Sequence, residues 1–387
     1  MDVLHASVLS SGDIPVSKVF EVLKKRKGIG DLAEIQEQIL ASGRQPLDLT
    51  TASKRIGTAY RNEKLVLILG SGVSKDYGMP TWKGLLQKLL GKTFESESAD
   101  PEKASFMSEM FDMIFGPDPL IAARRLALHF TELEKEKHKT LLFENAVRDI
   151  LYEEVSNQNP TPLFEEIVQF CVAPGRSYNL DSIVSYNYDD LLETHLKNLG
   201  VSVPFTSIFS AGQNPKPNQL PIYHVHGYLL HSGRLTKDNT ITLGDDAYHS
   251  QYSDVYRWSN LVQINKFVDC NCLFIGTSFT DPNQRRLLDI ARQQRGTNDI
   301  QHFLIKKRYS TIDTERALIN ILNTNDHTLD ESAQAELAIN ETVEDLISAI
   351  HMFETYDAHS FNVEVIWVNE YSDIPQILKE IRESSYD

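Results

Sequence analysis

An apolar strand, a glycine turn and an amphipathic helix, at residues 65–90, constrain the fold of this chain more than any other segment. Five consecutive apolar residues, Leu65–Leu69, predict a strand that is buried on both faces of a sheet. Gly70 and Gly72 follow, and glycine lets the backbone turn sharply and approach a ligand with no Cβ in the way. The next apolar residues recur at helical spacing: Trp82, Leu85, Leu86, Leu89 and Leu90. This order is how a nucleotide-binding βα unit begins, in which N–H groups and the helix dipole hold a pyrophosphate.

The glycine turn departs from the ordinary dinucleotide-binding fingerprint. Counting from Gly70, the third glycine position holds Lys75, and no acidic residue ends a second strand about 20 residues later. A purely structural turn is therefore an open alternative. Three further segments, each a strand that ends in polar residues, favour ligand binding.

The first of these segments is Ser182–Asp190. Its strand passes through Ile183, Val184 and Tyr186 and leads into a helix. Asp189 or Asp190 can cap that helix, which is a structural alternative for the two aspartates. Asn187 is harder to explain as a cap, and it lies where open α/β sheets place ligand contacts, at the carboxyl end of a strand.

The second segment, Ile222–Tyr228, carries two histidines. Strand alternation predicts that His224 and His226 share one face. We interpret His224 as a buried histidine satisfied by hydrogen bonds. A His-x-His metal pair is the alternative, but no third ligand is evident nearby. His226 is expected to end the strand, before Gly227, and its ordinary pKa suits acid–base chemistry.

The third segment is Cys272–Asn283. A buried strand runs into Gly276, Thr277 and Ser278, whose small hydroxyl side chains suit hydrogen bonding to a ribose or phosphate. A plain helix cap at Thr280 or Asp281 is the structural alternative.

The rest of the chain adds helices and more strands to this sheet. Residues 1–62 are expected to form a helical N-terminal extension, and residues 63–387 the main domain. Within it, residues 95–178 predict a helical insertion that could roof the cleft above the glycine turn. Residues 301–387 are expected to complete the fold, with strands at His302–Ile305 and Val363–Trp367.

Composition excludes several classes of function. The net charge of −16 argues against broad binding to nucleic acid by this chain alone, although a small anionic cofactor stays compatible with it. The chain has no run of 18 apolar residues, so we expect no membrane span, and Met1–Ser7 lacks a signal-peptide pattern. Three cysteines cannot form a disulfide framework, which fits a reducing cytoplasm.

Together the four segments resemble the sirtuin family. Gly70-Ser71-Gly72-Val73-Ser74 with Met79-Pro80-Thr81-Trp82 resembles its first cofactor loop, and Asn187-Tyr188-Asp189 its Asn-x-Asp segment. His226-Gly227 is similar to the catalytic histidine segment, and Gly276-Thr277-Ser278 to the ribose-binding turn. The resemblance implies a Rossmann-like parallel sheet. It spans residues 63–300.

Two departures narrow the resemblance. The paired Cys-x-x-Cys motifs of deacetylase sirtuins are absent, so no zinc is expected, and Trp82-Lys83 replaces the usual Phe-Arg. Gly276–Asn283 and Val365–Asp373 resemble zinc-less sirtuin-like effectors of bacterial anti-phage systems. That likeness implies hydrolysis of NAD+ to nicotinamide and ADP-ribose, homo-oligomers and, in one such group, a HerA-type ATPase or translocase partner.

The resemblance also implies roles for single residues. Asn187 would orient the ribose or the attacking water, and His226 would act as the base. Asp189 would contact the carboxamide, and Thr277 and Ser278 would lie near the adenosine ribose. Gly70, Ser71, Gly72 and Ser74 would hold the pyrophosphate, with Thr81 and Trp82 in the same loop. A non-catalytic NAD-binding regulator and an NAD-dependent deacylase are the alternative functions.

Overall fold

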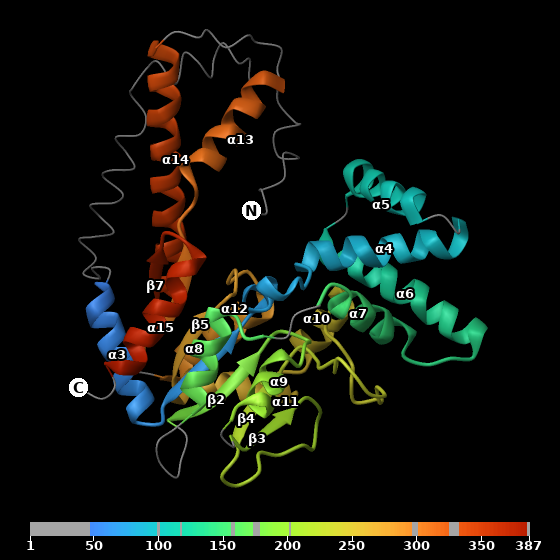
Figure 1. The fold of residues 1–387 in the computed structure, drawn as a ribbon, viewed down its shortest axis with the longest axis horizontal. Helices are drawn as coiled ribbons and strands as arrows, with labels where there is room; N and C mark the ends of the chain where they lie inside the picture. Colours follow the sequence, from blue (N-terminus) through green and yellow to red (C-terminus); the bar gives the residue numbers. More distant parts are fainter. Residues whose placement is uncertain are drawn as a thin grey trace. The chain divides into compact units, whose positions relative to one another are not determined.

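Figure 1 shows the computed structural model of the chain, which describes residues 47–98, 101–116, 118–155, 159–172, 179–200, 203–295, 301–324 and 333–384. The chain divides into two compact units. The larger comprises Leu47–Lys306 and Phe361–Asp387, and the described part of the smaller lies within Lys307–Ser360. Residues 1–46 of the expected N-terminal extension lie outside the described part.

The larger unit is built on a seven-stranded sheet with the order β3-β4-β2-β1-β5-β6-β7. Neighbouring strands from β3 to β6 run parallel, as expected for a Rossmann-like fold. The strands are β1 Leu65–Leu69, β2 Leu180–Ser185, β3 Phe205–Ile208, β4 Leu220–His224, β5 Asn271–Ile275, β6 His302–Lys307 and β7 Val363–Val368.

The strand order reverses at β1. The chain builds β2, β3 and β4 on one side of this strand, then crosses to place β5, β6 and β7 on the other. Ligands of open α/β sheets bind outside the carboxyl ends of the strands at such a switch point. The Gly70 turn after β1 and the Gly276 turn after β5 both lie there.

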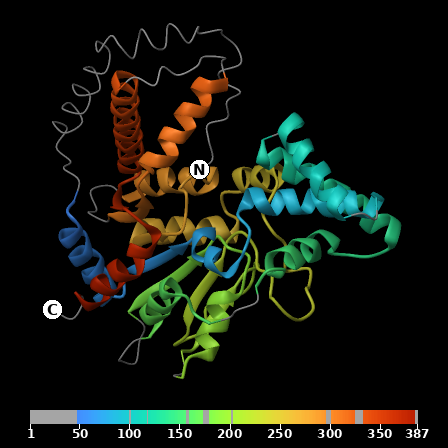
Figure 2. The same ribbon diagram turned by 45° about the horizontal axis from the view of Figure 1, so that its top comes forward.

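Helices cover both faces of the sheet. On one face, alternate β1 residues share a core with helices α3 (Leu49–Arg61), α8 (Pro162–Cys171), α9 (Leu191–Asn198) and α15 (Ile374–Glu383). This core contains Leu65, Leu67 and Leu69 of β1, together with Ile56, Phe164, Leu192 and Ile377 of these helices. On the other face lie α11 (Trp258–Asp269) and α12 (Pro282–Arg295), where Phe267 packs on Phe274 of β5 with ring centroids 6.1 Å apart. Figures 1 and 2 both show α3 beside α15, so segments from the two ends of the described chain pack together.

The predicted insertion at 95–178 is helical. Its region contains α5 (Pro101–Phe115), α6 (Pro119–Lys137) and α7 (Leu142–Tyr152), which pack with α4 (Trp82–Ser98) into one group (Figure 1). The end of α7 reaches the strand ends: the Tyr152 hydroxyl accepts a hydrogen bond from the Asp190 amide (2.9 Å) and donates one to the Leu229 carbonyl oxygen (2.8 Å). A short helix, α10 (Asp245–Ser253), contacts α6.

The smaller unit contributes α13 (Thr311–Thr324) and α14 (Ala333–Ser360), which pack on each other. Tyr309 ties the start of this unit to α14, because its amide donates to His351 and its hydroxyl to Glu354 (2.8 Å). Among the described residues, no helix is both long enough and apolar enough to cross a membrane.

The structure confirms six of the strands that the sequence predicts and corrects where two of them end. Strand β2 ends at Ser185, so Tyr186 lies beyond it. Strand β4 ends at His224, so His226 lies beyond it and not at its last position. The expected alternation of the two histidines on one face is therefore wrong. Strand β3 was not predicted, because this edge strand has a single buried residue, Ile208.

Glycine at the switch point serves the contact between two turns. A Cβ on Gly70 would lie 2.6 Å from the Gly276 carbonyl oxygen, and one on Gly72 would lie 2.8 Å from the Gly276 Cα. Gly276 itself has φ +68°, which disfavours other residues. The glycines thus let the turn after β1 pack directly on the backbone of the turn after β5.

Replacing Gly70 by alanine is therefore expected to lower the free energy of unfolding by about 1–3 kcal/mol, because the clashing atoms are backbone and cannot rotate away. Urea unfolding followed by circular dichroism measures the effect. The control is Gly200→Ala, whose new methyl group would meet nothing within 4 Å and should change stability by less than about 0.5 kcal/mol. Equal midpoints for both variants would contradict the tight contact.

Candidate active site

Four strands end level with one another at the predicted site. Leu69 of β1 is in register with Ser185 of β2 and Ile275 of β5, and Ser185 is in register with His224 of β4. Asn187 and His226 each follow two residues after such a registered pair. The segments predicted to form a site therefore leave the sheet at the same edge.

Four backbone amides of the glycine turn already make hydrogen bonds within the protein. The amides of Gly70 and Gly72 donate to the carbonyl oxygens of Ile275 (3.0 Å) and Gly276 (2.8 Å). Those of Val73 and Ser74 donate back within the turn. In this conformation these four amides of the Gly70–Ser74 turn are held by backbone hydrogen bonds, and the binding of a pyrophosphate by the turn stays a prediction.

Asn187 and Asp189 clamp this turn from the neighbouring strand. The Asn187 amide nitrogen donates to the Gly70 carbonyl oxygen (3.0 Å) and to the Ser74 hydroxyl (3.2 Å). The Ser74 hydroxyl in turn donates to Asp189 (2.9 Å). Asn187, Ser74 and Asp189 are all buried. Both protons of the Asn187 side-chain amide are thus engaged, which leaves the side-chain carbonyl oxygen to accept a hydrogen bond from a ligand.

Asp189 also contacts the start of the helix that follows it. Its other carboxylate oxygen accepts a hydrogen bond from the amide of Leu191, the first residue of α9 (3.2 Å), whereas the N-cap residue is Asp190, whose side chain makes no cap hydrogen bond. Burial raises the pKa of Asp189 to about 6, although the hydrogen bonds from Ser74 and Leu191 oppose that shift. The predicted contact of Asp189 with a carboxamide stays a prediction.

His224 belongs to a buried ion pair. Its Nε2 lies 2.7 Å from Glu193 of α9, and its Nδ1 lies 3.3 Å from the backbone carbonyl oxygen of Asn187. Ser207 of β3 donates to the same Glu193 oxygen (2.7 Å). The interpretation of His224 as a buried histidine satisfied by hydrogen bonds is confirmed. The contact also ties His224 to the backbone of Asn187.

The two pKa values of this pair shift in opposite directions. Burial disfavours the charged His224, but the Glu193 charge and hydrogen bond outweigh it and raise the pKa of His224 above 6.5. Burial likewise disfavours the charged Glu193, but His224 and Ser207 outweigh it and lower the pKa of Glu193 below 4.5. The pair is therefore charged on both sides between those two pH values.

His226 lies in a different environment. Its ring meets the edges of Tyr186 (centroids 4.7 Å apart) and Tyr248 (5.9 Å), and its Nε2 lies 3.6 Å from Asp281. Within the described part of the chain, that buried nitrogen has no hydrogen-bond partner. Burial lowers the pKa of His226, and the positive charge of Arg257 adds to this, while Asp281 opposes it. His226 is thus neutral at pH 7 and able to accept a proton.

Asp281 connects His226 to the start of α12. One of its carboxylate oxygens accepts from the Gln284 amide (2.6 Å), which is the helix cap that the sequence left open. The other accepts from the Tyr248 hydroxyl (2.6 Å) and faces His226. The sequence pointed to Asp281 only as a cap, and it gave no signal for Tyr248 or Arg257.

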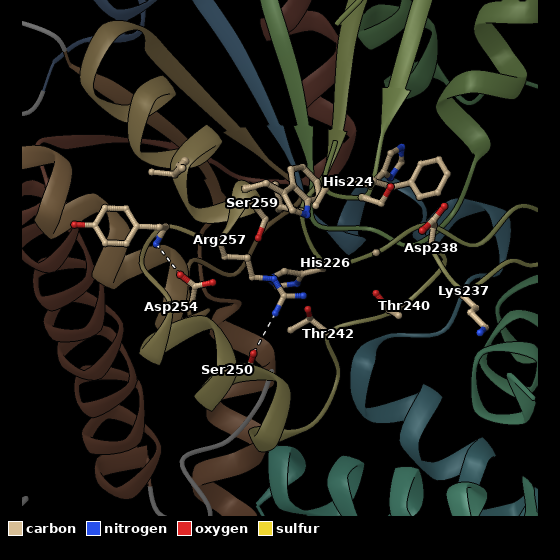
Figure 3. Close-up of a pocket in the computed structure, with 18 residues that line it drawn as sticks. His224, His226, Lys237, Asp238, Thr240, Thr242, Ser250, Asp254, Arg257 and Ser259 are labelled. Carbon is tan, nitrogen blue, oxygen red and sulfur yellow. Dashed lines mark hydrogen bonds between the residues drawn. The ribbon is translucent and has the colours of Figure 1, made fainter. Parts of the chain in front are cut away.

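A pocket of about 620 Å³ opens beside His226 (Figure 3). The pocket is lined by His224, His226 and Gly227, by residues 209–211, and by some of residues 237–242 and 250–261. Asn187 and the glycine turn do not line this pocket. The structure thus brings His226 to a pocket and Asn187 to the glycine turn.

The remaining predicted residues form local contacts. Thr81 accepts a hydrogen bond from the Gly84 amide (3.3 Å) at the start of α4, and Trp82 and Ser71 are exposed. The Thr277 hydroxyl accepts from the Phe279 amide (3.1 Å), and Ser278 pairs with Thr280 (2.6 Å). Their roles in cofactor binding stay predictions. In the described residues, no group of three or more His, Cys, Asp or Glu side chains is placed to hold a metal ion.

Comparison with known proteins finds similarity over part of this chain. A family model described as the SIR2-like domain matches residues 181–327. The matched segment includes Asn187, Asp189, His226 and the Gly276 turn, whereas the Gly70 turn lies before it.

One relative has a stated activity. The chain is 27% identical over 212 residues to the NAD(+) hydrolase ThsA of Enterococcus faecium, a match that covers 53% of this chain and 38% of that protein. The chain thus spans well under half of the relative's length. A crystal structure of a SIR2 homologue–NAD complex matches with a TM-score of 0.34 and 13% identity, over 86% of this chain and 94% of that one. That similarity is too low to inform fold or function.

Glu193→Gln is expected to lower the free energy of unfolding by about 3 kcal/mol, since it removes one partner of a buried ion pair. The pKa of His224 is raised, so its contribution is complete below pH 6.5 and is lost as the pH rises through the raised value. The contribution of Glu193 is lost as the pH falls through its lowered pKa. The difference between wild type and variant should therefore be largest between pH 4.5 and 6.5 and smaller at pH 8.

Urea unfolding at pH 5.5, 6.5 and 8 measures that difference. The matched control is Glu153→Gln, because Glu153 pairs with Lys88 on the surface at 3.0 Å and such pairs contribute at most about 1 kcal/mol. A Glu193→Gln difference that stays constant over this pH range would show that His224 is not charged in the native state.

Proposed function

We propose that this chain is an NAD+ hydrolase that cleaves the bond between nicotinamide and ribose. The observation that carries this proposal is His226: a neutral, buried imidazole whose Nε2 makes no hydrogen bond, in the lining of a pocket and beyond the carboxyl end of a strand of a parallel sheet. The SIR2-like match and the similarity to the NAD(+) hydrolase ThsA support NAD+ as the substrate.

His226 is proposed as the general base. Breaking the N-glycosidic bond builds positive charge on the ribose, and the incoming water or a ribose hydroxyl must lose a proton. A base serves best when its unprotonated form is present at the working pH. His226 meets that condition because its pKa lies below 6.5, and Asp281 at 3.6 Å stabilises the imidazolium that forms.

Asn187 is proposed to orient the ribose or the attacking water through its carbonyl oxygen. Its amide nitrogen is already committed to Gly70 and Ser74, so the side chain is held in one orientation. A fixed acceptor beside the reacting sugar lowers the entropic cost of reaching the transition state. The same bonds couple Asn187 to the glycine turn. If the turn opens for the cofactor, Asn187 changes position with it.

Two alternatives remain distinct in their chemistry. A non-catalytic NAD-binding regulator would bind the cofactor and release no nicotinamide. A deacylase would consume NAD+ only with an acylated peptide. The unbonded Nε2 of His226 favours catalysis over regulation, because a buried imidazole nitrogen without a partner is costly unless a function uses it.

His226→Ala is expected to lower the rate of NAD+ hydrolysis by about 10²–10⁴-fold, the usual contribution of a general base. Asn187→Ala should abolish measurable turnover as well, since it removes the ribose contact. Release of nicotinamide and ADP-ribose, followed by chromatography, is the measurement, with circular dichroism to show that both variants fold. Normal turnover in both variants would refute the proposed site.

The pH dependence provides a separate test. Because the pKa of His226 is lowered, kcat/KM should stay level down to pH 6.5 and fall only below it, as the base becomes protonated. Asp281→Asn keeps the helix cap but removes the charge that raises this pKa, so the fall should move to lower pH. Asp289→Asn, on the exposed side of α12, is the control and should leave the profile unchanged.

We also propose, from the likeness to anti-phage effectors, that hydrolysis depletes NAD+ in infected cells. A homo-oligomer and a HerA-type ATPase partner belong to this proposal. Incubation of the chain with NAD+, with and without a candidate ATPase, tests whether hydrolysis depends on that partner. Nicotinamide release that never depends on the partner, even in the assembled complex, would remove the partner from the proposal.

A further inference from the structure

The pocket beside His226 has a buried end and an exposed rim that differ in charge. His226, Thr242 and Ser259 are buried at its inner end, and Arg257 is half-buried there. Lys237 and the carboxylates of Asp238 and Asp254 lie among exposed lining residues. Among the described residues that line the buried end, the charged side chains are His224, which is paired with Glu193, and Arg257, for which no ion pair is found.

The first turn of α11 faces this inner end. Arg257 is the N-cap residue of that twelve-residue helix, and the amides of Asn260 and Leu261 donate to its carbonyl oxygen. Trp258 and Ser259 precede them, in the turn where helix amides have no acceptor within the helix. The positive end of the helix dipole adds to these donors.

Two buried polar atoms in the lining lack partners. Ser259 is 1% exposed and lines the pocket (Figure 3), and its hydroxyl has no hydrogen-bond partner among the described residues. His226 is 7% exposed, and the same holds for its Nε2. Buried polar atoms are almost always satisfied by protein, water or a ligand. Their convergence on one pocket therefore points to a polar ligand.

Arg257 specifies the charge of that ligand. Its guanidinium donates to the Ser250 hydroxyl at 3.4 Å, and none of the ion pairs between described residues includes it. Figure 3 shows the guanidinium directed toward His226, on which its charge acts. The nearby Asp254 carboxylate already accepts from the Tyr256 amide (3.1 Å). A half-buried guanidinium without a carboxylate partner favours an anion with several oxygens.

We propose that this pocket binds a phosphate or pyrophosphate group, held by the first turn of α11, the Ser259 hydroxyl and the Arg257 guanidinium. Its volume of about 620 Å³ accommodates a nucleotide-sized ligand. The phosphate belongs either to the dinucleotide substrate or to a second phosphorylated ligand. Anion binding here does not require hydrolysis, so the site stands or falls independently of the proposed activity.

Isothermal titration of inorganic pyrophosphate into the full chain tests the site. Wild type should bind, Arg257→Gln should bind at least about 10-fold more weakly, because it loses charge-assisted hydrogen bonds, and Ser259→Ala about 2–10-fold more weakly. The matched control is Arg55→Gln, because Arg55 lies on α3 and binds Gln301 outside the pocket. It should bind as wild type does.

A second measurement reports on the position of the anion. A phosphate beside Arg257 offsets the charge that lowers the pKa of His226, so bound pyrophosphate should raise that pKa in an NMR titration of the histidine ring. Arg257→Gln should raise the pKa of His226 without pyrophosphate and abolish the further increase. Absence of binding to wild type, equal binding to Arg257→Gln, or an unchanged His226 signal would each overturn the proposal.

Competition with NAD+ identifies the source of the phosphate. Displacement of pyrophosphate by NAD+ and by ADP-ribose assigns the site to the substrate, whereas simultaneous binding assigns it to a second phosphorylated ligand. Arg257-dependent binding of pyrophosphate by a chain that releases no nicotinamide would support the site and refute the hydrolase. Nicotinamide release with no pyrophosphate binding would support the hydrolase and refute the anion site.

Discussion

The contact between the turns after β1 and β5 is the constraint on which the rest of the site depends. Gly70 and Gly72 approach Gly276 so closely that a Cβ on either would overlap backbone atoms. Backbone hydrogen bonds between the turns then hold β1 and β5 together beyond their last paired residues. Asn187 binds the Gly70 carbonyl oxygen, so the position of the strand β2 loop follows from that of the turn. A sheet whose order reverses at β1 is thereby closed at the edge where a ligand is expected.

Much of the fold could be predicted because buried parallel strands have an unmistakable pattern. Leu65–Leu69 is fully buried, as its five apolar residues indicate, and the same pattern identified the cores of β2, β4 and β5. Strand β3 escaped because an edge strand buries little and needs no apolar run. That Asn187, His226 and Gly276 lie at the same edge of the sheet was also predictable, since parallel strands in register end together.

What the sequence could not reveal is which side chains pair. The partners of His224 and His226 come from α9 and from the cap of α12, and only the packing of those helices decides that Glu193 faces one histidine and Asp281 the other. The glycine turn shows the same limit. Its composition is equally compatible with an approach to a ligand and with an approach to another turn, and the observed amide bonds go to the second. Local sequence records that close approach is needed and not what approaches.

Because β4 ends at His224, two histidines that are two residues apart lie in different environments, and one is protonated while the other is neutral. Had the strand continued, both side chains would share a face and an environment. Instead His224 pairs with Glu193, whose charge raises its pKa, while His226 packs beside the Tyr186 ring, where burial lowers its pKa and the positive charge of Arg257 adds to this. The first histidine can then hold the Asn187 backbone as a fixed cation, and the second stays free to take a proton. That division of labour needs the chain to leave the sheet at His224, where Gly227 at φ +116° soon turns the backbone tightly against Thr240.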